Sequence, residues 1–196
     1  MTNRTQPISE LLGTAAAQAV PAVRGVADSD LDAPTPCSEY DVRALLNHLF
    51  QVVVNFQALA AKQPADFSTT PDHLADPDWR VRFEAETAKL VAAWAAPGAE
   101  EGTSGGMGLP SRTVGSMVLL DLTVHVWDLA RATGRTFVPE PDVVENLAEL
   151  VDRMAPTARS MNVFGEPVEP PRGASAFELL LAATGRDPRG WAAATG

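Results

Sequence analysis

The stretch SRTVGSMVLLDLTVHVWDLARATG, residues 111–134, decides the fold class because it is long, apolar and patterned as a helix. Its apolar side chains recur at steps of three and four residues, the period of an amphipathic α-helix. Gly134 is suited to end this helix after Arg131, because glycine readily adopts the left-handed conformation found at helix C-termini. We therefore predict a helix that begins near Ser111 and ends at Gly134.

The same stretch places a carboxylate and an imidazole within its apolar stripe. On a helical wheel, Asp121 and His125 fall within roughly 40° of each other. They share that face with Met117, Val118, Leu122 and Leu129. Burying an unpaired carboxylate costs several kcal/mol of folding free energy, so a partner must offset that cost. A metal ion would do so, because the i, i+4 spacing lets both side chains reach one ion, and Asp128 on the same flank could orient a ligand from behind.

The region before residue 63 carries two more helical patterns. Apolar side chains from residue 8 to 23 recur at helical spacing, and Pro21 is expected to bend or end that helix early, because proline removes a backbone hydrogen bond. A second helix is predicted from about Glu39 to about Lys62. Ser38 with Asp41 three residues later is typical of a capping box at its start.

The rest of the chain alternates helical patterns with loops. A third helix is predicted from about Trp79 to Ala96, with an inward row of Val81, Ala85, Ala88, Val91 and Ala92. Residues 97–110 are rich in glycine and bounded by prolines, which predicts a loop or a short hairpin. Helices are also expected over about 141–155 and 174–184. Four long helices with mostly long connections indicate an all-α bundle with extra C-terminal helical pieces outside it.

Composition excludes several classes of function. Hydrophobic residues make up 45% of the 196 residues, too many for a disordered chain. With 25 acidic against 15 basic side chains, the net charge of −10 argues against a nucleic-acid partner and disfavours anionic membranes. One cysteine excludes an internal disulfide and any zinc site that needs two thiolates. With no recognisable secretory signal and no stretch expected to span a membrane, the sequence predicts a cytoplasmic protein.

The second predicted helix offers a third metal ligand. His48 lies about 80° from the centre of its apolar stripe, at the edge of the core. Two histidines and a carboxylate leave coordination positions open, which is typical of a catalytic or ligand-binding metal site. Two other interpretations stay open: a histidine at such an edge is commonly hydrogen-bonded in place, and Asp121 can simply pair with His125. His73 is a rival third ligand, although its proline-flanked loop favours a solvated side chain.

Two further features are given structural interpretations. Cys37 precedes the second predicted helix, where backbone amide dipoles would favour its thiolate, but we interpret it as a small buried apolar residue. The glycine-rich stretch 102–108 lacks the Gly-Lys-Ser/Thr ending of a phosphate-binding loop. Neither feature predicts a site of its own.

Three stretches resemble one known family. TPCSEYDVRALLNH, residues 35–48, resembles the opening of the second helix in the mycothiol-dependent maleylpyruvate isomerase N-terminal family. DLTVHVWDLARATG, residues 121–134, resembles the metal-bearing fourth helix of that family. LLLAATGRDP, residues 179–188, is similar to the tail of an uncharacterised subgroup. The resemblance covers about residues 7 to 190, and the family belongs to the DinB-like metal-binding bundles, which are abundant in actinobacteria.

The resemblance implies an up-and-down four-helix bundle with a divalent metal, zinc or nickel, near one end. The family's ligand positions match His48, Asp121 and His125, with the shorter Asp121 standing where the isomerase has Glu. The resemblance further implies that residues 1–160 form the DinB-like bundle. Residues 161–196 are then a short tail with one helix packed on the bundle, where the isomerase carries a further domain.

The resemblance also implies a chemistry. A metal with an open position lowers the pKa of a low-molecular-weight thiol, mycothiol in this family, and the thiolate can attack a small electrophile. The expected protein is a transferase or isomerase whose partners are a small-molecule thiol and an electrophilic substrate. Association into a homodimer is a further open expectation. The alternatives are a non-catalytic bundle that holds a metal or small ligand, and a purely structural bundle. Maleylpyruvate itself is not carried over, because a shared fold is not a shared function.

Overall fold

The computed structural model describes residues 6–106 and 108–191, and its regular structure is nearly all helical. The helices are α1 (Ile8–Arg24), α2 (Val42–Ala60), α3 (Trp79–Trp94), α4 (Ser111–Ala132), α5 (Pro141–Ser160) and α6 (Ala176–Ala183). The loops contain two 3-10 turns, η1 (Asp28–Asp30) and η2 (His73–Ala75), and a hairpin that pairs β1 (Thr103–Ser104) antiparallel with β2 (Leu109–Pro110). The predicted all-α class is confirmed.

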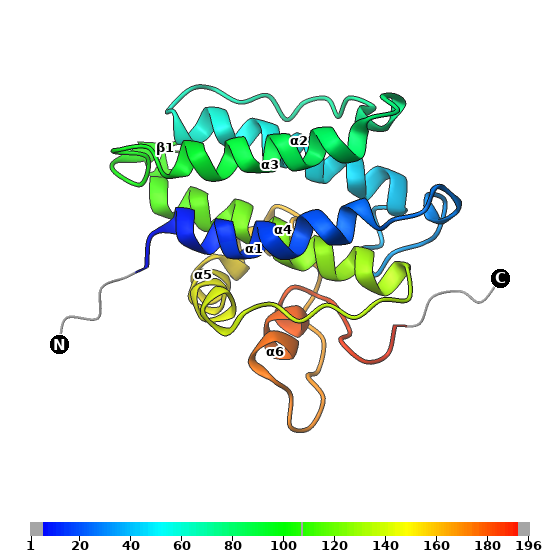
Figure 1. The fold of residues 1–196 in the computed structure, drawn as a ribbon. Helices are drawn as coiled ribbons and strands as arrows, with labels where there is room; N and C mark the ends of the chain where they lie inside the picture. The colour runs from blue at the N-terminus through cyan, green and yellow to red at the C-terminus, as the bar shows by residue number, and fades with distance from the viewer. Residues whose placement is uncertain (1–5, 107, 192–196) are drawn as a thin grey trace.

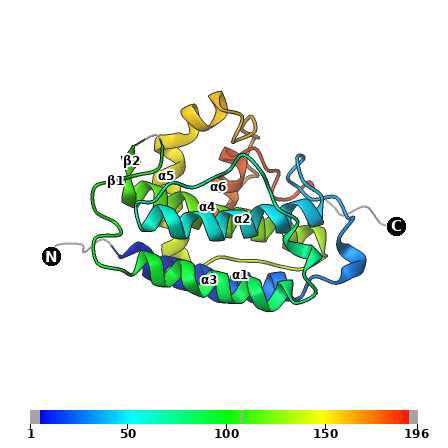
Figure 2. The same cartoon turned by 90° about the horizontal axis from the view of Figure 1, so that it is seen from above.

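Helices α1 to α4 form a four-helix bundle (Figure 1). Helix α1 packs against α3 and α4, and α2 packs against the same two helices. The connection over residues 61–78 runs back along the length of the bundle, so α2 and α3 point in the same direction. Seen from above, α1 and α3 form one layer, α2 and α4 form the next, and α6 lies beyond them with the end of α5 (Figure 2).

Helix α4 is the central helix of this arrangement. Within residues 6–106 and 108–191, it is the one helix long and apolar enough to cross a membrane, and 72% of its apolar window is buried inside the bundle. The sequence analysis expected no membrane-spanning stretch, and α4 reaches the required length and composition as a mostly buried helix of the core. The burial explains the composition, because a helix surrounded by other helices is apolar on nearly every side.

The inward face of α3 differs from the predicted one. Its buried residues are Trp79, Phe83, Thr87, Leu90 and Trp94, whereas the predicted inward residue Val81 is 61% exposed. Both sets have helical spacing, so periodicity alone could not separate them. The larger side chains turn inward because burying them removes more apolar surface from water.

The start of α2 also differs from the prediction. The helix begins at Val42, and its N-cap is Asp41, whose carboxylate accepts a hydrogen bond from the Ala44 amide at 2.7 Å. The predicted capping box at Ser38 is therefore wrong. The preceding loop is held by a hydrogen bond of 2.7 Å from the Thr35 hydroxyl to the Tyr40 carbonyl, which keeps residues 35–40 out of the helix.

Two helices are longer than predicted, since Pro21 was expected to bend or end the first and the other was expected to end near residue 155. Helix α1 continues beyond Pro21 to Arg24, and α5 continues beyond Pro156 to Ser160. Each proline lies near the C-terminal end of its helix, where the missing amide removes a single intrahelical hydrogen bond. The extra turn of α5 matters for the site, because Thr157 and Ala158 line the cavity described below.

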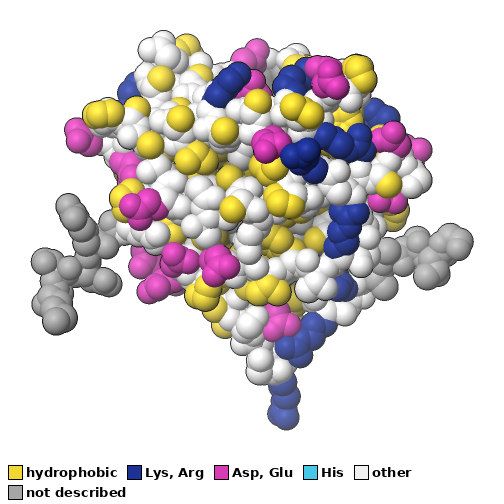
Figure 3. Space-filling view, in the orientation of Figure 1, with side chains coloured by type: hydrophobic (Ala, Val, Ile, Leu, Met, Phe, Trp, Pro, Cys, Tyr) yellow, Lys and Arg dark blue, Asp and Glu magenta, His cyan; other side chains and the backbone are white. Residues whose placement is uncertain are grey.

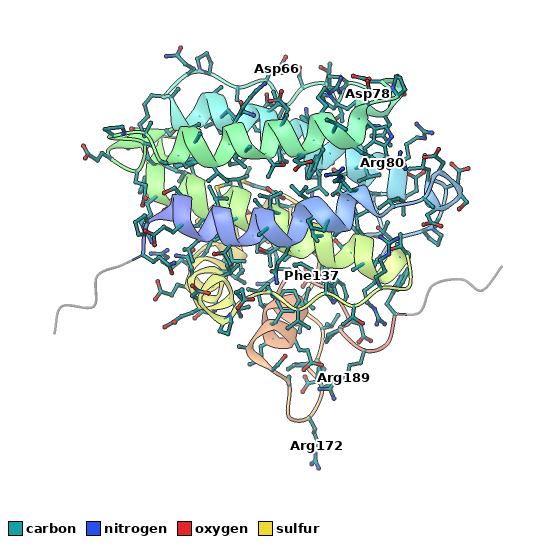
Figure 4. The ribbon with its side chains drawn as sticks, in the orientation of Figure 1. Asp66, Asp78, Arg80, Phe137, Arg172 and Arg189 are labelled. Atoms are coloured by element: carbon teal, nitrogen blue, oxygen red, sulfur yellow. The ribbon has the colours of Figure 1, made fainter. Side chains whose placement is uncertain are left out.

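The segment after α5 lies against the bundle. Helix α6 packs on α5, and a capping box between Ser175 and Glu178 fixes its start. Arg159 donates a hydrogen bond of 2.8 Å to the Ala183 carbonyl at the end of α6. In Figure 4, Arg172 projects from the tip of the loop before α6, whereas Arg189 lies beside α6, where it pairs with Glu178.

The surface formed by α1 and α3 carries mixed charges. Acidic, basic and apolar side chains are interspersed on it, and acidic ones gather toward α5 (Figure 3). Such a pattern is typical of a solvated surface. A cavity lies on the other side of α2 and α4.

Candidate metal centre

A cavity of about 810 Å³ lies between α2, α4 and α5. The turn over residues 161–165 and residues 184–186 after α6 complete one wall, and the hairpin closes the far end. No described residue of α1 or α3 contributes to the lining. The cavity therefore opens on the face of the bundle that the C-terminal segment partly covers.

His48, Asp121 and His125 come together at one end of this cavity. Asp121 Oδ1 lies 3.7 Å from His48 Nε2 and 3.5 Å from His125 Nε2, and one ligand atom from each residue lies within 4.8 Å of the others. Donor atoms about 2.1 Å from a tetrahedral zinc ion are about 3.4 Å from one another. The two separations from Asp121 are thus close to those that such an ion requires, and they are too long for good hydrogen bonds.

Asp128 holds His125 from the side away from the cavity. His125 Nδ1 lies 3.0 Å from Asp128 Oδ2, and Asp128 has no exposed surface. Burial alone would raise the pKa of Asp128, but its hydrogen bond with His125 and the charge of Arg186 bring that pKa below its ordinary value. An ionised carboxylate can only accept, so Nδ1 carries a proton and Nε2 is the ring nitrogen on the side of Asp121 and the cavity. Metal-binding histidines are typically oriented in this way.

Arg186 completes this network from the C-terminal segment. Its Nη2 lies 2.9 Å from Asp128 Oδ2, and its Nε lies 3.3 Å from both carboxylate oxygens. Nη1 donates to the Thr184 carbonyl at 3.2 Å. Burial would lower the pKa of Arg186, but the adjacent carboxylate raises it. The sequence analysis missed Arg186, and the one available signal was that a buried acid on α4 needs a cation from some part of the chain.

Tyr40 is a second residue that the sequence analysis missed. Its ring stacks on that of His48 with centroids 5.1 Å apart and an angle of 21°, and its centroid lies 6.2 Å from that of the His125 ring at an angle of 75°. Burial, then the negative charge of Glu39, raises the pKa of Tyr40, so its phenol stays protonated at neutral pH. Tyr40 therefore supports the orientation of His48 through ring contact.

Cys37 lies in the cavity wall, and its prediction as a buried apolar residue was only partly right, since it is half-buried. Its sulfur approaches His125 and Asp128 closely enough to form a second cluster of ligand atoms. The Asp128 carboxylate and His125 Nδ1 are already engaged with each other and with Arg186, so this cluster does not fit a metal. Burial raises the pKa of Cys37 although Arg186 opposes it, which keeps the side chain a thiol.

His73 lies outside the cavity. Its ring stacks on Phe50 with centroids 4.9 Å apart, and its Nδ1 lies 3.0 Å from Arg82 Nη2. The ring is half-buried rather than solvated, and its Nε2 has no hydrogen-bond partner. The structure thus does not bring the rival ligand to the site.

The environment of His73 predicts a pH-dependent stability. Burial, then the charge of Arg82, lowers the pKa of His73. Because the folded pKa lies below the unfolded value of about 6.5, the stabilising contribution is present above pH 6.5 and is lost as the pH falls through the folded pKa. We expect urea unfolding of the metal-free protein to show a steeper loss of stability below pH 6.5 than that of His73→Phe, which keeps the ring contact. Equal pH slopes in the two proteins would contradict this prediction.

Comparisons with known proteins agree with this architecture. The model of the mycothiol maleylpyruvate isomerase N-terminal domain matches residues 12–130. Two relatives, uncharacterised proteins from two strains of Mycobacterium tuberculosis, are each 31% identical over 169 residues, which cover 81% of this chain and 86% of theirs. No solved structure matches the chain. The matched range contains the three clustered residues and ends before Arg186.

Proposed function

Because the chain belongs to the mycothiol maleylpyruvate isomerase N-terminal domain family, we propose that it is a cytoplasmic, metal-dependent enzyme that uses a small thiol. His48, Asp121 and His125 would hold a divalent ion. The observation that carries this proposal is the spacing of their donor atoms, with Asp121 Oδ1 3.7 and 3.5 Å from the two imidazole nitrogens. The proposed activity is that of a transferase or isomerase acting on a small electrophile.

Two imidazoles and one carboxylate suit both zinc and nickel. We propose zinc as the bound ion and nickel as the alternative. When bound, such an ion would lower the pKa of a low-molecular-weight thiol, mycothiol by the family's description, and so supply a thiolate nucleophile. Three protein ligands leave room for that thiol. The thiol would come from outside the chain, because Cys37 lies beside His125 and Asp128 rather than among the three ligands, and burial raises its pKa.

The other residues at this end of the cavity position the ligands. Asp128 keeps the proton of His125 on Nδ1, and Arg186 keeps Asp128 ionised and in place. Tyr40 stacks on His48 and limits the rotation of its ring. The cavity walls beyond them are mostly apolar, which strengthens the electrostatic interactions at the site.

Elemental analysis of untagged protein tests the proposal. We expect about one equivalent of zinc, nickel or another divalent ion in the wild type, and none in a His48→Ala/His125→Ala variant, because two of three ligands are gone. His73→Ala is the matched control, since it removes a histidine outside the cavity and should keep the metal. An absence of metal even after incubation with zinc would contradict the proposal.

A screen of thiols against small electrophiles then tests catalysis. Thiol-dependent turnover that disappears with the metal supports the enzyme. Stoichiometric metal without turnover across the screen would instead indicate a non-catalytic bundle that holds a metal or small ligand.

A further inference from the structure

The cavity extends well beyond the three clustered residues. From the His48 end to the hairpin, its walls are apolar side chains of α2, α4 and α5, namely Val52, Phe56, Leu59, Val114, Met117, Leu120, Val124, Leu150 and Met154. A volume of about 810 Å³ lies within the range of cavities that enclose drug-sized ligands. The site therefore has one polar end and a long apolar body.

The charges on the cavity wall are poorly suited to a dicarboxylate. Among the described lining residues, Arg186 is the one lysine or arginine, and its guanidinium is already engaged by Asp128. Glu39 and Asp121 add negative charge. The proposed divalent ion could attract one carboxylate of such a molecule, but the walls toward the hairpin provide no cation for the second.

The opening of the cavity is apolar as well. Phe67, Met161 and Val163 line it, and they are 48%, 52% and 64% exposed. They belong to a small group of large apolar side chains that are exposed in residues 6–106 and 108–191. Exposed apolar side chains grouped around one opening commonly mark a binding site.

We infer that the electrophilic substrate is a neutral, elongated molecule with an apolar body and one polar head, rather than a dicarboxylate. This inference rests on the proposed function, which places the reacting head beside His48, Asp121 and His125. The body lies along the wall that Met117 and Met154 form. Methionine side chains suit this task because they are flexible and adapt to apolar ligands of different shape.

Titration calorimetry on chelator-treated protein tests the inference without the metal. The probes are 2-hexanone, 2-decanone and 2-tetradecanone, which are unreactive neutral ketones, and maleate, which is a small dicarboxylate. We expect affinity to rise by up to about fourfold for each methylene group that is buried, and maleate not to bind measurably. Affinity that is independent of chain length, or maleate binding as tight as that of the ketones, would overturn the inference.

Substitutions that fill the cavity locate the binding. Met117→Trp and Met154→Trp should each weaken 2-decanone binding by about tenfold or more, because the indole occupies the space of the alkyl chain. Val81→Trp is the matched control, since Val81 is exposed on α3 outside the cavity. Circular dichroism checks that each variant folds, and the chain-length series on the wild type stands if one does not. Equal ketone binding in all three variants would overturn the inference.

The two proposals fail separately. Ketone binding without any metal uptake would contradict the proposed function but still support the apolar cavity as a ligand site. Metal uptake without ketone binding would contradict only the inference about the substrate.

Discussion

An Arg186→Leu variant is expected to lose about 3–5 kcal/mol of unfolding free energy, because it leaves a buried carboxylate without its cation. Asp128 has no exposed surface, and Arg186 makes contacts of 2.9 and 3.3 Å to its oxygens. In the variant, Asp128 must stay charged in an apolar interior or take up a proton, and both outcomes destabilise the fold. Urea unfolding followed by far-UV circular dichroism measures the change.

Two control variants separate the buried pair from general effects at the C-terminal segment. Arg189→Leu removes a neighbouring arginine whose partner Glu178 lies at the surface, so stability should change little. The double variant Asp128→Leu/Arg186→Leu removes both charges and should be far more stable than Arg186→Leu alone. If Arg186→Leu is as stable as Arg189→Leu, the ion pair does not have the role described.

An Asp128→Asn variant is expected to bind metal about 10- to 100-fold more weakly than the wild type. The amide of asparagine can donate a hydrogen bond to His125 Nδ1, which moves the ring proton to Nε2. That proton then points at the position where the donor atoms of His48 and Asp121 converge. Competition with a chromophoric zinc chelator gives the affinity.

Glu39→Gln is the matched control for that experiment. It removes one negative charge from the same cavity, at an exposed position of the wall, and leaves the tautomer of His125 alone. The affinity should then fall by much less than in Asp128→Asn. Equal losses in both variants would show that net charge, rather than the orientation of His125, governs binding.

Local sequence patterns predicted the helices and part of the site. The i, i+4 spacing of Asp121 and His125 within an apolar stripe was sufficient to place both on one face of α4, and the structure brings His48 to them from α2. The inward face of α3 could not be predicted, since two rows of residues share the helical period. Arg186 and Tyr40 were missed because their contacts depend on how distant segments dock, which periodicity does not encode.

The position of Arg186 along the chain has a consequence for biosynthesis. Residues that build α1 to α4 leave the ribosome before Arg186, which follows Ala132, the end of α4, by 186 − 132 = 54 positions. At 5–20 residues per second, translation of that interval takes roughly 3 to 11 seconds. During this time the nascent bundle carries Asp128 without its cation, so the carboxylate that contacts His125 is held in place by Arg186 only once the segment carrying Arg186 docks. The cluster of His48, Asp121 and His125 thus gains the support of Arg186 only after the helices that carry these three residues have been made.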